Sequence, residues 1–217
     1  MNQLEGAMYY FIKHFPQTLG RTALIKAIYL LDCEWYKSFG KTYTGLRYMR
    51  DQNGPFDTSF YEAKDSLIAS SLITEEQYYY SAGYGFNFKL SKLIDDNELG
   101  LDLLAMSMAE EIVGKLSNKD LKTFLDCAYS TPPMQEVLGE ENAKEGLLLG
   151  RELDMSRLNK PLKPLFDLDE IKVASRSLDM EDRGSDEDYN KAVIEEMNEL
   201  SIYKERVEKV WELTGEK

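Results

Sequence analysis

The chain has 217 residues, of which 43% are hydrophobic and 30% are charged, a balance typical of a soluble globular protein with a core. Its 39 acidic and 26 basic residues give a net charge of −13, which argues against a protein that coats nucleic acid over its whole surface. Only two cysteines, Cys33 and Cys127, and the lack of a basic leader or an apolar run of ~18 residues indicate a cytoplasmic protein without a signal peptide or membrane span.

Apolar residues at helical spacing predict two helices at the start of the chain. The first covers residues 3–14 and ends before Pro16, which cannot continue it. The second runs from about Leu19 to Ser38, with Thr18 as its expected N-cap. Gly40 follows, where a residue in the left-handed conformation ends a helix with little strain.

The next thirty residues predict a short strand, a turn and a third helix. Lys41–Met49 alternates weakly and contains Gly45, which suits a short edge strand or an extended crossing. In Gln52–Pro55, the Asn and Gly tolerate positive φ and the Pro fixes its own, so a turn is expected. Ser59 and Glu62 have the spacing of a capping box, which predicts a helix that fades near Ser71.

Two aromatic-rich runs then predict a β-hairpin. They are Ile73–Tyr80 and Tyr84–Leu90, joined by a Ser-Ala-Gly turn. Helices followed by such a hairpin have the outline of a winged-helix-like unit. The aromatic residues leave two interpretations open. They form a platform for stacking bases, or they place one face in the core and the other on a contact surface.

The second half of the chain predicts more helices and then a change of character. Leu99–Leu116 is strongly helical, and a shorter helix ends near Ala128. Tyr129–Met134 holds two prolines, which interrupt a helix but are favourable at the start of one. We therefore expect one domain over residues 1–150, mainly α with a small β-hairpin (α+β), followed by an acidic linker over residues 151–188.

Residues 189–217 predict a C-terminal amphipathic helix. A helix of this composition must bury its apolar face on its own domain, on a second copy or on a partner protein. This helix is the candidate for partner-specific contacts. Its apolar stripe consists of Tyr189, Val193, Met197, Leu200, Tyr203, Val207, Val210 and Trp211.

The sequence offers no set of residues for catalysis, metal binding or cofactor binding. His14 is the single histidine and is expected to be a surface or capping residue. Without a second histidine or a cysteine pair, a zinc site has no support. Phosphate-loop and nucleophile-elbow motifs do not occur. Adjacent acids such as Glu140-Glu141 are expected to be solvated. We therefore expect no enzyme, no cofactor and no metal.

Asp32 is the most unusual charged residue of the second helix, because it borders the apolar stripe. A buried carboxylate needs a partner, and Lys26, Arg47 or Arg50 is the expected one. Two interpretations remain open. The pair is a salt bridge that holds the fold, or these residues belong to a partner-binding surface.

Basic residues concentrate in the first quarter of the chain. Residues 1–50 contain seven basic and three acidic residues, whereas residues 51–150 contain seven basic and eighteen acidic ones. Arg47 and Arg50 would contact phosphates if the winged-helix-like portion bound operator DNA. The alternative is ordinary surface charge that balances an acidic protein.

A set of spaced residues across these elements resembles the Panacea domain of SocA-like antitoxins, found in type II toxin–antitoxin systems of prokaryotes and phages. The resemblance covers about residues 5–145 and includes Leu72-Ile73 and Tyr129–Met134 as later landmarks. The motif residues that carry it are Lys26, Tyr29, Asp32, Tyr36, Gly40, Thr44, Gly45, Tyr48, Gly54 and Pro55.

The resemblance implies an antitoxin that neutralises a cognate protein toxin by direct binding and does not catalyse a reaction. Delivery of the toxin to a protease is compatible with the same domain. The rival hypotheses are a winged-helix-like DNA-binding regulator, which would autoregulate its operon, and an interaction protein without a toxin neighbour. A homodimer is also compatible with the sequence.

Overall fold

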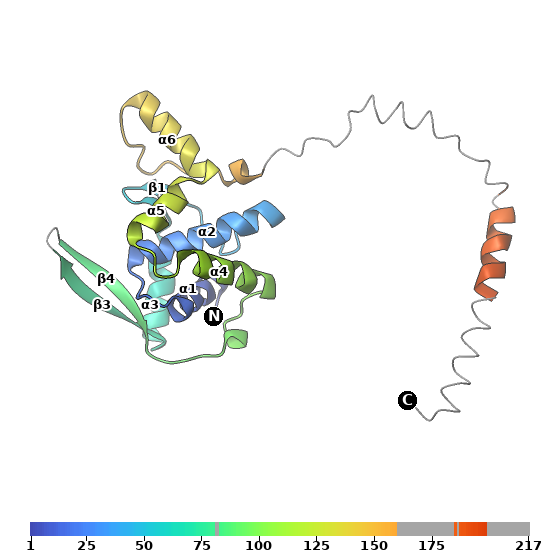
Figure 1. Cartoon of the computed structure of the whole chain (residues 1–217), viewed down its shortest axis with the longest axis horizontal. Coiled ribbons are helices and arrows are strands. Elements are labelled where there is room, and N and C mark those ends of the chain that lie inside the picture. The colour runs from blue at the N-terminus through green and yellow to red at the C-terminus, as the bar shows by residue number, and fades with distance from the viewer. Residues whose placement is uncertain (81–82, 160–184, 186, 199–217) are drawn as a thin grey trace. The chain divides into compact units, whose positions relative to one another are not determined.

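The computed structural model describes residues 1–80, 83–159, 185 and 187–198. The chain divides into two compact units, Met1–Pro161 and Leu162–Lys217. The first unit is mainly α-helical with two small antiparallel hairpins (Figure 1), which confirms the predicted fold class. No helix within these described ranges is long and apolar enough to cross a membrane.

The first two helices follow the predicted pattern closely. Helix α1 (Gln3–His14) begins with a capping box between Asn2 and Glu5. Helix α2 (Arg21–Phe39) ends at Gly40, which has φ of +68° as expected. The predicted cap at Thr18 is wrong. Gly20 occupies the N-cap position and offers no side-chain hydrogen bond, so α2 starts later than its apolar pattern suggested.

The segment after α2 forms a small hairpin, but not where a strand was predicted. Strands β1 (Met49–Asp51) and β2 (Gly54–Phe56) pair antiparallel across a turn at Gln52-Asn53, so Gly54 and Pro55 of the predicted turn belong to β2. Residues 41–48 form a loop and not a strand. The backbone amides of Thr44 and Arg47 donate to the carboxylates of Asp32 and Asp57, so they are not available to hydrogen-bond a neighbouring strand.

Helix α3 (Ser59–Ala69) starts without the predicted capping box. Thr58 is its N-cap and makes no side-chain cap hydrogen bond. The Asp57 carboxylate instead accepts the Ser59 amide at 2.8 Å. An Asx turn therefore replaces the Ser59–Glu62 pair, because the aspartate is already placed before the first helical amides.

Strands β3 (Ile73–Tyr80) and β4 (Gly83–Leu90) form the predicted hairpin. Their register runs from Ile73↔Leu90 to Tyr80↔Gly83. The base is fixed to the body, since Ile73 and Phe88 are buried and the Phe88 amide donates to the Leu19 carbonyl at 3.0 Å. The far half projects from the helical body (Figure 1).

The remaining helices wrap around α2. A 3-10 helix, η1 (Asp96–Glu98), precedes α4 (Leu103–Leu116), which begins later than predicted because Asp102 caps it. Then follow α5 (Leu121–Tyr129) and α6 (Pro132–Lys144), which starts on its two prolines, one of the two roles that the sequence left open for them. Helix α2 packs against α1, α4 and α5 and has more buried residues than any other described helix of the unit.

Residues 151–159 differ from the predicted acidic arm, because they pack on the domain. The amide of Leu153 donates to the Tyr48 carbonyl at 2.8 Å, and Glu152 bridges to Met49. A second 3-10 helix, η2 (Met155–Leu158), contacts α2 and α6. Three apolar side chains in this short segment, Leu153, Met155 and Leu158, are buried, which gives it enough hydrophobic area to stay on the body.

Candidate partner-binding site

Asp32 lies in the middle of α2 with its side chain fully buried. Its Oδ1 accepts the Thr44 amide at 2.9 Å, and its Oδ2 accepts the hydroxyls of Thr44 and Tyr48 at 2.5 and 2.7 Å. The predicted cation partner is therefore wrong: neutral donors from one loop satisfy the carboxylate. Burial raises the pKa of Asp32 to about 6, although these hydrogen bonds act to lower it.

The Asp32 network fixes the loop Lys41–Tyr48, which we call the motif loop. Thr44 and Tyr48 hold it from the inside, while the Arg47 amide donates to Asp57 Oδ2 at 2.6 Å. Gly45 turns the loop with φ of +78°, a conformation that favours glycine. The side chains of Lys41 and Arg47 are exposed, and the backbone that carries Arg47 is held by these hydrogen bonds.

Lys26, a predicted contact residue, points into the protein. Its side chain is buried, and its Nζ donates to the Pro55 carbonyl at 2.6 Å. Burial lowers the pKa of this amine to about 7. Lys26 therefore joins α2 to β2 and is not available to a partner in this conformation.

Arg50 is also internal, and its partner is far away in the sequence. Its Nε donates to Glu141 Oε1 at 2.9 Å and its Nη2 to Oε2 at 3.3 Å, a two-pronged pair between β1 and α6. Burial raises the pKa of Glu141, but the hydrogen bonds from Arg50 and the Leu148 amide outweigh it and lower the pKa below its usual value. The expectation that Glu141 is solvated is thus wrong, and Arg50 cannot contact DNA phosphates from this position.

The other motif residues support the same arrangement. The Tyr29 hydroxyl bonds the Thr131 hydroxyl at 2.7 Å, which ties α2 to the corner before α6. Its ring meets the Tyr48 ring edge-on at 4.8 Å. Gly54 has φ of +88°, and a Cβ there would stand 3.0 Å from the Tyr129 ring. Tyr36 is half-buried and lines the surface beside the motif loop.

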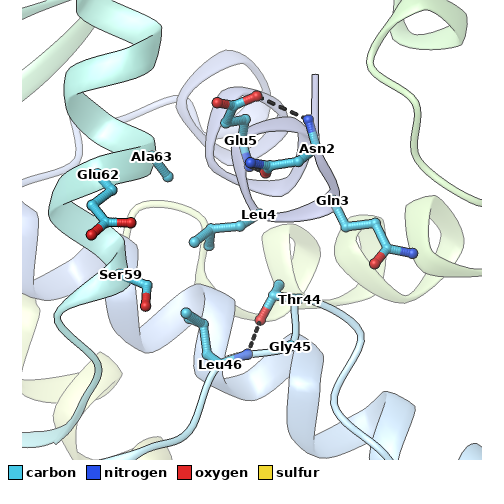
Figure 2. Close-up of a pocket in the computed structure, with 10 residues that line it drawn as sticks. All are labelled: Asn2, Gln3, Leu4, Glu5, Thr44, Gly45, Leu46, Ser59, Glu62 and Ala63. Carbon is cyan, nitrogen blue, oxygen red and sulfur yellow. Dashed lines mark hydrogen bonds between the residues drawn. The ribbon is translucent and has the colours of Figure 1, made fainter.

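Two open grooves flank the motif loop. The first, of about 440 Å³, lies between the starts of α1 and α3 and the loop. Figure 2 shows Leu4 at its centre, with Ser59 and Glu62 on one side and Thr44–Leu46 below. The second, of about 520 Å³, lies on the other side and is lined by Lys41, Arg47 and residues 151–156. The loop is therefore a ridge between two depressions.

Reactive groups do not converge on these grooves. His14 pairs with Asp96 at 2.9 Å and stacks on Tyr10. Cys33 is buried, and burial raises the pKa of its thiol well above the usual value. Across the described ranges, no three His, Cys, Asp or Glu residues are grouped to hold a metal ion. What the arrangement offers is shape, with two exposed cations on a fixed loop.

In the second unit, residues 187–198 are helical, and most of their side chains are exposed. Tyr189 and Met197 of the predicted stripe are 56% and 65% exposed, and Val193 is half-buried. The rest of the stripe lies outside the described residues, namely Leu200, Tyr203, Val207, Val210 and Trp211.

Sequence reasoning missed two features of the site. The first is that Asp32 pairs with Thr44 and Tyr48; all three belong to the motif, so the motif itself was the available signal. The second is the Arg50–Glu141 pair, for which the sequence has no signal, since the partners are separated by 91 positions. The first was missed because a cation, Lys26, Arg47 or Arg50, was expected to pair with Asp32.

Comparison with known proteins gives a match to a protein family. The family model described as "Antitoxin SocA-like, Panacea domain" matches residues 24–133, from the first turn of α2 to the start of α6. This stretch contains Asp32 with its loop donors, Lys26 with Pro55, and Tyr29 with Thr131. No curated protein and no solved structure matches the chain.

Proposed function

The chain belongs to the SocA-like antitoxin family with a Panacea domain, and we propose that it neutralises a cognate protein toxin by binding it directly. The observation that carries this proposal is the match itself, because the matched stretch is the one in which Asp32 fixes the motif loop. A role in a toxin–antitoxin pair is the general role of the family. Direct binding is the mode that the geometry of the loop supports best.

The physical argument for binding is preorganisation. A loop that is already fixed loses little conformational freedom when it meets a partner, so more of the contact energy remains as affinity. Arg47 is exposed at the ridge between the two grooves, and Lys41 lies beside it. We propose that this ridge contacts the toxin.

The second unit supports an additional contact. Tyr189, Ile194 and Met197 are large apolar residues that stay exposed on one short helix. Exposed apolar side chains in a helix gain by burial on a partner. We propose that they add partner-specific contacts to those of the ridge.

Co-expression tests the proposed function. The protein encoded beside this chain serves as the candidate toxin, and growth of the host and co-purification on size exclusion are the two readouts. We expect the chain to restore growth and to elute with the toxin. Arg47→Glu should weaken both effects, whereas Lys115→Glu, at an exposed site on α4, is the matched control. Restored growth without a complex would contradict direct binding.

A further inference from the structure

A third groove, of about 560 Å³, lies between the β3–β4 hairpin, the start of α2 and α5. It shares no lining residue with the two grooves beside the motif loop. We propose that it is a docking site for an acidic, apolar segment of the partner protein. This inference rests on the proposed function, because the partner is the toxin.

The charge of the groove is opposite to that of the chain. Arg21 and Lys119 are among its lining residues, and no Asp or Glu is. The chain as a whole carries −13. A carboxylate from a partner therefore finds a positive site here, on a chain whose net negative charge disfavours its approach in general.

Arg21 is held in place by aromatic rings and not by a carboxylate. Its guanidinium carbon lies 5.8 Å from the centre of the Tyr61 ring and 5.9 Å from that of Phe86. Its Nη1 donates to the Tyr61 hydroxyl at 3.3 Å. Among the described residues, neither Arg21 nor Lys119 forms an ion pair. Both charges are thus free to meet a carboxylate from outside.

The hairpin supplies an apolar wall. Tyr78 and Tyr84 are 43% and 58% exposed, and the Tyr84 ring packs edge-on against Phe86 at 5.6 Å. Tyr78 lies across Gly85, where an added Cβ would stand 2.6 Å from its ring. Tyrosine and arginine are enriched among the interface residues that contribute most to the binding energy. The wall therefore suits apolar side chains next to the carboxylate.

The same features disfavour a nucleic acid as occupant. A strand of DNA or RNA would need a row of cations along its backbone. Only two cations, Arg21 and Lys119, line the groove, and the hairpin adds none to its lining. A protein segment with one or two carboxylates therefore matches the groove better than a chain of phosphates does.

Affinity measurements with the full chain and the candidate toxin encoded beside it test the site. Arg21→Glu, Lys119→Glu and Tyr84→Ala each remove one feature of the groove, and we expect each to weaken the Kd by about tenfold or more. Two matched controls lie outside it. Tyr79→Ala changes a more exposed tyrosine of the same hairpin, and Lys122→Glu changes an exposed lysine in the first turn of α5, three positions after Lys119. Thermal unfolding confirms that each variant is folded.

A photo-crosslinking amino acid at position 84 identifies the occupant. We expect it to label a toxin segment in which Asp or Glu lies within a few residues of apolar side chains. Labelling of a nucleic acid, of a second copy, of the chain's own acidic residues 179–188 or of a basic toxin segment would overturn the proposal. If groove variants bind the toxin as the wild type does, this inference fails and the proposed function stands. If the wild type does not bind at all, both fail.

Discussion

Asp32 and Glu141 are two buried carboxylates in the same unit, and their surroundings differ in kind. Asp32 accepts hydrogen bonds from neutral groups of one nearby loop, and burial raises its pKa to about 6. Glu141 faces the guanidinium of Arg50, and its pKa is lowered. One carboxylate thus positions a loop, whereas the other joins β1 to α6.

The difference teaches how each site responds to disturbance. Loss of one partner of the Arg50–Glu141 pair leaves an uncompensated charge inside the protein. Loss of one donor to Asp32 leaves two others in place, and the carboxylate can take up a proton instead of remaining charged. The charged pair is therefore the more fragile site, and the loop anchor is the more sensitive to pH.

Glu141→Ala is expected to change stability more than any other substitution proposed for these two sites. Arg50 would remain buried without its counter-charge, and we expect the free energy of unfolding to fall by about 3–5 kcal/mol. Urea denaturation measures the loss. Glu140→Ala is the matched control on the same helix; its carboxylate is more exposed and its ion pairs lie at the surface, so a change within about 1 kcal/mol is expected. Equal losses in both variants would contradict a special role of the buried pair.

The pH dependence of stability sharpens the comparison for Asp32. Its pKa rises from the ordinary 3.8 to about 6 on folding, so between these values the folded chain keeps a proton that the unfolded chain has released. The stabilisation from this group is complete below about pH 4 and is lost as the pH rises towards 6, by roughly 3 kcal/mol at most.

Asp32→Asn supplies the reference for that measurement, because the amide does not titrate. The difference in unfolding free energy, wild type minus variant, should decrease from pH 4 to pH 6. Glu141→Gln should show the opposite sign: the advantage of the wild type is lost as the pH falls through the lowered pKa of Glu141. A difference for Asp32 that stays flat or increases would refute the neutral-donor account.

Thr44→Val tests the anchor at neutral pH with almost no change in shape. The substitution removes the hydroxyl that donates to Asp32, and a hydrogen bond to a charged group contributes about 2 kcal/mol. The loss of unfolding free energy in Thr44→Val should be smaller near pH 4, where Asp32 is protonated. Thr42→Val is the control, since that hydroxyl donates only weakly, to the Leu46 carbonyl at 3.4 Å. Both are read from denaturation curves.

Tyr29→Phe has the smallest expected effect. It removes the hydroxyl that bonds Thr131 but keeps the ring against Tyr48, so we expect a loss of about 1 kcal/mol. A melting-temperature shift of a few degrees would report it. A loss as large as that of Glu141→Ala would mean that the corner before α6 depends on this hydroxyl more than on the charged pair.

Local physical rules account for how far sequence reasoning reached. The Gly40 end of α2 and the β3–β4 hairpin each depend on residues within a few positions, and each was predicted; a helix start at the prolines of α6 was left open. Of the two alternatives for Lys41–Met49, the edge strand is wrong for the complementary reason. Its backbone amides are taken by Asp32 and Asp57, which a local pattern does not report.

By itself the sequence determined the helical and hairpin elements, the family and the identity of the motif residues, because short-range backbone preferences and spacing encode them. Only the tertiary structure decided that Lys26 and Arg50 lie inside, that Thr44 and Tyr48 are the partners of Asp32, that Glu141 is the partner of Arg50, and that residues 151–159 belong to the domain. Burial and ion pairing depend on which distant segments meet. Burial and ion pairing are therefore properties of the packed chain, because the residues that stabilise each contact are distant from it in the sequence.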